Sequence, residues 1–166
     1  LTYYYSDFDI FCSDIDNDGL IDIIASQDGT DKVFWFKNLG NFTFSTEKNI
    51  ANNIDKPKSI AVGDIDNDGD NDVVVGYYTD KNASLFLNQG NGTFATQKIV
   101  ANLNLEVNKV KLNDIDNNGY LDIVTGERDG TIYVTKNIDG TNFKAPEYLT
   151  GGADGGSNFD FIEACA

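Results

Sequence analysis

The sequence predicts an all-β protein, a β-propeller with three four-stranded blades of about 50 residues and the first strand of a fourth. Three observations carry this prediction. An acidic motif recurs at a fixed spacing along the chain. Short β-branched and aromatic runs alternate with clusters of Gly, Asn and Asp, which is typical of strands joined by tight turns. No stretch keeps the 3.6-residue apolar period of a helix.

The repeat is defined by two motifs in the same phase. The first reads Asp-Ile-Asp-Asn-Asp-Gly at residues 14–19 and 64–69, and Asp-Ile-Asp-Asn-Asn-Gly at 114–119. The second, an Asn-rich element that ends in Phe, occupies residues 38–44 and 88–94 and, displaced by one residue, 137–143. We therefore expect one domain over residues 1–166, with blades at about 7–50, 57–100 and 107–149 and a further blade starting at 157–166.

Within each unit the apolar runs predict four strands. The expected strands are 8–13, 21–26, 33–37 and 42–48; 59–63, 72–78, 84–88 and 93–100; and 109–113, 121–126, 131–136 and 142–149. Several runs, such as residues 72–78, are apolar on both faces, as expected for strands buried between packed blades. Trp35, Phe36, Phe86 and Tyr133 are expected to pack between blades, the alternative being an aromatic platform for a ligand.

The acidic motif predicts a calcium loop. Oxygen-bearing side chains stand at its positions 1, 3, 5 and 9, and Gly at position 6 permits a sharp bend that aims them at one centre. The candidate ligands are Asp14, Asp16, Asp18 and Asp22; Asp64, Asp66, Asp68 and Asp72; and Asp114, Asp116, Asn118 and Asp122. Water and the backbone carbonyls of Leu20, Asp70 and Tyr120 would complete each shell of 6 to 8 oxygens.

Two alternatives bear on these loops. Asp-Asn-Asp-Gly is also good hairpin-turn chemistry, although three copies in phase, each with the ninth-position Asp, favour a cation. An EF-hand would need Glu at position 12, where this chain has Ala25, Val75 and Thr125. We expect three Ca²⁺ sites, of which the loop 114–122 is the weakest because Asn118 is neutral.

These motifs resemble those of the FG-GAP or VCBS repeat family, the calcium-bearing blades of propellers like those of integrin α-subunits. The resemblance spans about residues 8–149, and Asn118 is the one departure from the all-Asp ligand pattern. It implies a β-propeller whose calcium ions brace the hairpin between the first two strands of each blade, in an extracellular protein concerned with adhesion or carbohydrate contact. Members of the family usually have about seven blades, whereas this chain has three.

Composition excludes several functions. With 12 basic and 27 acidic residues the net charge is −15, which would repel nucleic acid. The absence of His excludes imidazole-based catalysis and His-ligated zinc sites. No apolar run approaches the roughly 20 residues of a membrane-spanning helix.

The tail and a few scattered residues raise further expectations. Cys12 and Cys165 would occupy equivalent blade positions, either as small buried residues or as a disulfide suited to an oxidising exterior. Candidate glycosylation sites, which would make the chain a glycoprotein, are Asn41, Asn82 and Asn91, although an Asn- and Thr-rich chain produces such triplets by chance. Since three blades leave two open faces, the chain is expected to be either a fragment or a unit whose copies join edge to edge.

Three functions follow from these observations. The first is a non-catalytic, calcium-stabilised extracellular adhesion module that presents propeller loops to a glycan or protein partner. The alternative is a structural subunit of an extracellular filament or surface layer, with further copies of itself as partners. An accessory domain of a secreted polysaccharide-active enzyme is the third, and the chain itself is expected not to be an enzyme because its clustered acids are those that calcium requires.

Overall fold

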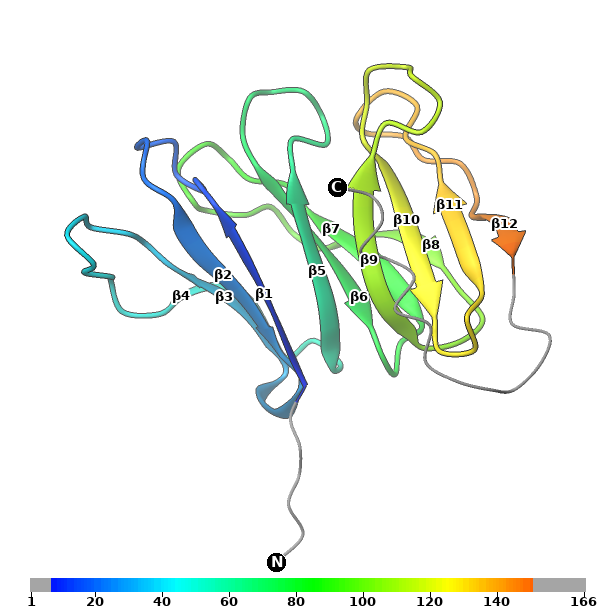
Figure 1. The fold of residues 1–166 in the computed structure, drawn as a ribbon, viewed down its shortest axis with the longest axis horizontal. Helices are drawn as coiled ribbons and strands as arrows, with labels where there is room; N and C mark the ends of the chain where they lie inside the picture. Colours follow the sequence, from blue (N-terminus) through cyan, green and yellow to red (C-terminus); the bar gives the residue numbers. More distant parts are fainter. Residues whose placement is uncertain (1–6, 151–166) are drawn as a thin grey trace, which may run out of the picture.

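The computed structural model describes residues 7–150 and shows an all-β chain (Figure 1). Its strands form three antiparallel sheets of four, and each sheet is built in chain order from neighbouring hairpins. Within the described residues there is no α-helix, only the short 3-10 helix Asp28–Thr30. None of the described helices could span a membrane.

The strands follow the repeat along the chain. The first sheet consists of β1 (Phe8–Ser13), β2 (Asp22–Gln27), β3 (Lys32–Phe36) and β4 (Lys48–Asn52). The second consists of β5 (Pro57–Gly63), β6 (Asp72–Tyr77), β7 (Asn82–Phe86) and β8 (Lys98–Asn102). The third consists of β9 (Val107–Asn113), β10 (Asp122–Glu127), β11 (Ile132–Thr135) and β12 (Glu147–Thr150).

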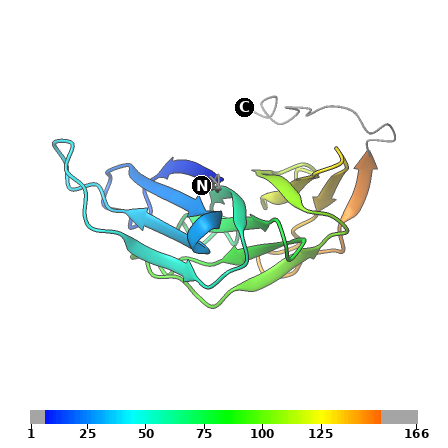
Figure 2. The ribbon, with the colours of Figure 1, turned by 90° about the horizontal axis from the view of Figure 1, so that it is seen from below.

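The three sheets stand side by side in an open arc (Figure 2). Their first strands, β1, β5 and β9, contact one another in turn, so each sheet presents a face to its neighbour. This arrangement confirms the all-β prediction and agrees with a propeller-like stacking of blades. Closure of a ring stays a prediction.

Two apolar cores fill the spaces between sheets. One joins the first and second sheets and contains Ile24, Trp35, Val73 and Tyr77, and the other joins the second and third sheets and contains Val74 and other aliphatic residues. Because the second sheet is covered on both sides, every residue of β6 is buried. Burial between two neighbouring sheets therefore explains why the run at 72–78 is apolar on both faces, as the sequence predicted.

Four aromatic residues were expected to pack between blades, and two of them do. Trp35 and Phe86 are 1% and 3% exposed and belong to the core between the first two sheets. Phe36 and Tyr133 are only half-buried.

The fourth strand was expected five or six residues too early in every unit, so the expected and observed strands share one residue in the first unit and three residues in each of the other two. Residues 42–48, 93–100 and 142–149 were expected, whereas the strands are Lys48–Asn52, Lys98–Asn102 and Glu147–Thr150. Residues 38–44 instead form a turn closed by an isolated bridge between Asn38 and Phe44, and the bridge recurs in the other units. Asn41 and Phe42 have φ of 52° and 58°, which a continuous strand cannot accommodate.

The two cysteines and the tail were also expected to show structure. Cys12 is exposed on β1, which corrects the expectation of a buried residue. Cys12 shares one face of β1 with Phe8 and Ile10, and no sheet packs on that face among the described residues, so its side chain is exposed. Cys165 and the expected blade start at 157–166 lie outside the described residues, so the disulfide stays a prediction.

Gly92 marks a close approach between neighbouring sheets. A Cβ atom built on Gly92 would lie 2.2 Å from Cζ2 of Trp35, and its φ is +72°. Gly40, at the nearby turn of the first unit, has a similar φ of +80° but nothing within 4 Å of a built Cβ. A substitution at Gly40 therefore tests the left-handed backbone alone, whereas a substitution at Gly92 tests the backbone and the contact with Trp35 together.

We predict that Gly40→Ala lowers the free energy of unfolding by about 1–2 kcal/mol, the cost of a left-handed L-residue. Gly92→Ala should cost a further ~1–3 kcal/mol, because the methyl group must displace the indole of Trp35. Urea unfolding of both variants measures the difference. Equal costs for the two substitutions would contradict the close packing of Gly92 on Trp35.

Candidate metal centre

The three acidic loops share one internal framework. In the first loop, Asp14 at position 1 accepts backbone hydrogen bonds from Asp18 N at 3.2 Å and Gly19 N at 2.8 Å. Asp64 and Asp114 accept the equivalent bonds in the other loops. The first carboxylate therefore fixes the bend of its own loop through these hydrogen bonds alone.

Two positions in each loop turn the backbone through left-handed conformations. Asn17, Asn67 and Asn117 have φ of 58°, 60° and 57°, and the glycines two residues later have φ between 86° and 95°. Asn tolerates this region better than other L-residues, and Gly enters it without penalty. The Asn-x-Gly spacing inside the motif thus explains how each loop folds back on itself.

The ninth-position carboxylate ties the loop to the rest of its sheet. Asp22 accepts a hydrogen bond from Ile15 N at 3.0 Å and another from Asn38 N at 2.7 Å. Asp72 and Asp122 bond the equivalent residues of their units. All three of these carboxylates have no exposed surface.

Sequence reasoning missed the role of three asparagines at the start of the second motif. Besides donating its N–H to the ninth-position Asp, Asn88 donates from Nδ2 to the carbonyl of Ile15 in the preceding unit at 2.7 Å. Asn137 repeats this bond to Ile65 at 2.9 Å. The recurrence of an Asn in fixed phase with the acidic loop was the available signal.

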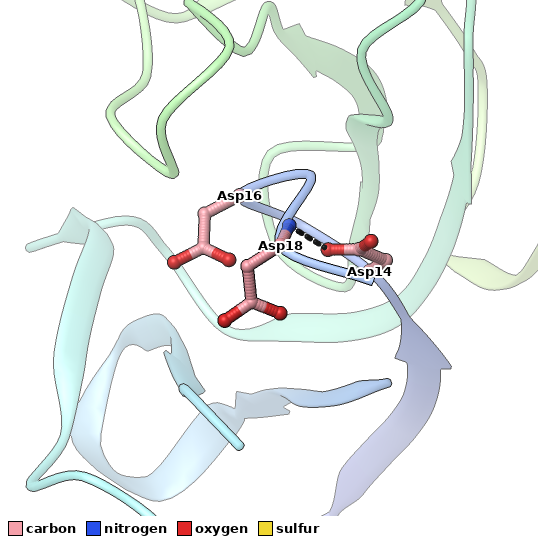
Figure 3. A group of neighbouring side chains, drawn as sticks. All are labelled: Asp14, Asp16 and Asp18. Atoms are coloured by element: carbon pink, nitrogen blue, oxygen red, sulfur yellow. Dashed lines mark hydrogen bonds between the residues drawn. The ribbon is translucent and has the colours of Figure 1, made fainter. Parts of the chain in front are cut away.

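In each loop the fold brings three carboxylates together. Their oxygens lie within 4.8 Å of one another in three groups: Asp14, Asp16 and Asp18; Asp64, Asp66 and Asp72; and Asp114, Asp116 and Asp122. In Figure 3 the first group converges on one side of the loop. Every donor is an oxygen, which favours a hard cation such as Ca²⁺ over zinc or copper.

The remaining predicted ligands lie outside these groups. Asp22 and Asp68 are not among the mutually close carboxylates of their loops. Asn118 donates from Nδ2 to the carbonyl of Asn137 at 2.8 Å and accepts from Tyr120 N, so its amide serves the loop itself. For the carbonyls of Leu20, Asp70 and Tyr120, ligation stays a prediction.

Two unsatisfied oxygens test whether a cation fits. Seven buried side-chain polar atoms of the described residues have no hydrogen-bond partner, and two of them are Oδ1 of Asp16 and Oδ1 of Asp66 in the acidic loops. Buried polar atoms are nearly always paired, and a carboxylate oxygen left alone is costly. A bound cation would satisfy both oxygens, so the first two loops fit the predicted ion on a ground independent of the motif.

The pKa values of the loop carboxylates also favour a bound cation. Burial raises the pKa of Asp72 to about 7, and the charges of Asp66 and Asp68 add to this, against two backbone hydrogen bonds that lower it. Burial and the neighbouring carboxylates likewise raise the pKa of Asp66. Burial is again the main cause of the raised pKa of Asp22. Carboxylates that resist ionisation in this way gain most from a neutralising cation.

Lys37 distinguishes the first loop from the second. Its Nζ contacts Asp16 and lies 2.8 Å from Oδ2 of Asp18. The contact with Asp16, followed by that with Asp18, raises the pKa of Lys37, and the hydrogen bond from Lys37 lowers the pKa of Asp18. The equivalent residue is Leu87 in the second unit, and in the third it is Lys136, whose Nζ is 4.0 Å from Asp116.

The candidate glycosylation sites differ in exposure. Asn41 and Asn91 are exposed in the turns of the second motif. Asn82 is 6% exposed in β7, where its Oδ1 accepts a hydrogen bond from Ser84. A sugar on Asn82 would need β7 to open, whereas Asn41 and Asn91 are accessible, and glycosylation stays a prediction.

We predict that Asp66→Asn has opposite effects with and without calcium. In millimolar calcium it should lower the free energy of unfolding by ~1–3 kcal/mol through weaker ion binding. In EDTA it should leave stability unchanged or raise it, because one of three crowded charges is removed. Thermal unfolding under both conditions measures this. Asp80→Asn, an exposed Asp outside the loops, is the control, and a loss of the same size in EDTA would contradict a cation-binding role.

We predict that, in EDTA, stability falls as the pH rises from 5 to 8. The folded pKa of Asp72 lies above its ordinary value of 3.8, so its contribution is full below about pH 4 and is lost as the pH passes through about 7. The expected loss is about 2–3 kcal/mol between pH 5 and 8. Calcium should abolish the loss by binding the ionised carboxylate, and a flat pH profile in EDTA would argue against the buried carboxylate as the source.

We predict that Lys37→Leu raises the calcium affinity of the first loop by about twofold to fivefold, because it removes a tethered competing cation. An NMR titration that follows the amides of residues 14–22 measures this site separately from the others. Lys136→Leu should have a smaller effect at the third loop, since its ammonium lies farther away. Unchanged calcium affinity in Lys37→Leu would show that the Lys37 ammonium does not compete with calcium for the first loop.

Comparison with known proteins agrees with the repeat and the fold. No curated protein matches the chain. Among solved structures, a lectin from Agrocybe aegerita, described for its specific recognition of non-reducing terminal N-acetylglucosamine, is similar with a TM-score of 0.63 and 25% sequence identity. The alignment covers 86% of this chain and 38% of the lectin, so the chain spans well under half of the lectin's length.

The sequence itself matches the FG-GAP-like repeat over residues 14–75 and again over residues 64–125. Each match starts at the first Asp of one acidic loop and runs through the next loop, so it contains the motifs and the ninth-position carboxylates described above. The chain belongs to the FG-GAP-like repeat family.

Proposed function

We propose that this chain is a non-catalytic carbohydrate-binding module of an extracellular protein, stabilised by calcium and directed at glycans that end in N-acetylglucosamine. The observation that carries the proposal is the similarity of 86% of the chain to a lectin described for that sugar. The family membership supports a stacked, loop-bearing scaffold of the kind that presents binding residues on rigid sheets.

Calcium would act as a brace for the loops. Three all-oxygen clusters, two unsatisfied buried oxygens and the raised pKa of Asp72 support a divalent cation in these positions. An ion held there would stiffen the turn between the first two strands of each sheet and keep the adjacent surface in one conformation. A preorganised surface binds a flexible glycan at lower entropic cost.

The distribution of acidic residues supports a binding role over catalysis. Each cluster of three carboxylates in the described residues lies in a repeated loop, where the same hydrogen-bond framework holds it. Three equivalent copies of one arrangement are expected of a structural site, whereas a glycosidase needs one distinct pair of carboxylates with separated pKa values.

The net charge of −15 adds a condition on the sugar. A strongly acidic surface disfavours sulfated or sialylated glycans, whereas N-acetylglucosamine is neutral. The proposal therefore includes discrimination against anionic glycans at low ionic strength, and this discrimination should weaken as salt screens the surface charge.

The test is binding of the chain, in millimolar calcium, to immobilised glycans that end in N-acetylglucosamine, in galactose or in sialic acid. We expect retention only on the first, with release by free N-acetylglucosamine and no release by galactose. Absence of binding to every glycan ending in N-acetylglucosamine would overturn the proposed sugar. Binding that survives EDTA, with the fold intact by circular dichroism, would remove calcium from the function while leaving the lectin role in place.

A further inference from the structure

Hydrogen bonds connect the three acidic loops, which lie at the same end of the sheets (Figure 1). Asn17, at position 4 of the first loop, donates from Nδ2 to Oδ1 of Asp70 in the second loop. Asn67, at the same position of the second loop, donates from Nδ2 to the carbonyl of Gly119 in the third loop at 2.8 Å. The left-handed asparagine of a loop therefore contacts the loop that follows it.

A second set of hydrogen bonds runs from the second unit back to the first loop. Asn71 donates from Nδ2 to the carbonyl of Asp14 at 3.0 Å. Asn88 donates from Nδ2 to the carbonyl of Ile15 at 2.7 Å, and its own N–H is held by Oδ1 of Asp72 at 2.8 Å. Asn71 directly precedes Asp72 in the chain. Residues that adjoin a candidate ligand of the second loop therefore fix the first two positions of the first loop.

The junction between the second and third loops has fewer of these bonds. Asn137 holds the carbonyl of Ile65, but Leu121 stands where the second unit has Asn71. Among the described residues, three such hydrogen bonds join the first and second loops, whereas two join the second and third.

These bonds act on atoms whose positions also decide ion binding. Asp14 and Asp72 are candidate ligands of different loops, and the carbonyl of Asp70 is another. An ion in the second loop would fix Asp72 and the backbone at Asp70, and with them the asparagines that hold the first loop. Part of the entropic cost of ordering the first loop would then be met before its own ion binds.

We propose that the loops bind calcium cooperatively, most strongly between the first and the second, through these asparagines. The proposal rests on the calcium part of the proposed function. An ion in either loop raises the affinity of the other by the same factor, because a coupling free energy between two sites is reciprocal. We expect a factor of about five, at the lower end of the usual coupling between sites. The loops then fill over a narrower range of calcium concentration than independent sites would.

Charge alone predicts a change of the opposite sign. A second loop that holds Ca²⁺ is less negative than an empty loop that has lost one carboxylate, so it attracts a cation to the first loop less strongly. Salt at about 0.15 M screens this effect over distances beyond about 8 Å. The sign of the change in affinity therefore separates coupling through hydrogen bonds from long-range electrostatics.

The test is an NMR titration of the whole chain with Ca²⁺ at about 0.15 M salt. The amides of residues 14–22 report on the first loop and those of residues 64–72 on the second. Asp66→Asn, which removes a candidate ligand of the second loop, should lower the calcium affinity of the first loop about fivefold. Asp16→Asn should lower the affinity of the second loop by the same factor. An unchanged or higher affinity in the intact loop of either variant would overturn the proposal.

Two substitutions test whether the asparagines transmit the coupling. Asn17→Gly keeps a backbone with φ of 58° that Gly adopts freely, and Asn71→Leu introduces the residue that the third unit has at this position. With both in place, Asp66→Asn should change the affinity of the first loop by about twofold or less, because one of the three hydrogen bonds remains. Full coupling in this background would overturn the proposal.

Asn117→Gly is the matched control. Asn117 is the equivalent left-handed asparagine of the third loop, and its side chain makes no hydrogen bond within the described part of the chain. This substitution should leave the coupling between the first two loops unchanged, and loss of coupling here would overturn the role of the specific bonds.

The titration also separates this proposal from the proposed function. Calcium binding with independent affinities would overturn the coupling and leave calcium as a brace for each loop. Absence of calcium binding in every loop would overturn both the coupling and the calcium part of the proposed function. Glycan binding is tested by retention on immobilised sugars and does not enter these titrations.

Discussion

The repeat depends on a buried carboxylate that accepts two backbone hydrogen bonds. At the ninth position of each acidic loop this Asp holds the N–H of the Ile at position 2 and the N–H of the Asn that opens the second motif. The same Asn then reaches the position-2 carbonyl of the preceding unit. The Asp therefore joins its loop to the start of the second motif, and the Asn at that start joins the unit to the preceding one.

This arrangement carries an electrostatic cost that links the fold to the proposed cation. The carboxylate must be buried to reach both N–H groups, and burial raises the pKa of Asp72 to about 7. Two further carboxylates lie close by in the same loop. A divalent ion would offset this cost for the whole cluster, so the proposed calcium would be bound by the same residues that define the fold.

The fold class could be predicted from the sequence because the acidic motif, its Asn and Gly at left-handed positions and the apolar runs repeat in phase. Most strands were located well, but the fourth strand was not, since Phe42 looks like a strand residue although its backbone has φ of 58°. The sequence predicted the candidate ligands as a set, but not which three carboxylates of each loop lie close together. The first cluster includes the fifth-position Asp18, and the second includes the ninth-position Asp72 instead. This choice depends on contacts such as that of Lys37 with Asp18, which connect residues far apart in sequence.

Amide hydrogen exchange measures the ninth-position hydrogen bonds most directly. The N–H groups of Asn38, Asn88 and Asn137 should be among the slowest to exchange in calcium, although they sit at the start of turns, and they should lose protection together with those of Ile15, Ile65 and Ile115 when calcium is removed. If the asparagine amides instead exchange as fast as those of the exposed turns, with or without calcium, the carboxylates do not hold the repeat together and the account is wrong.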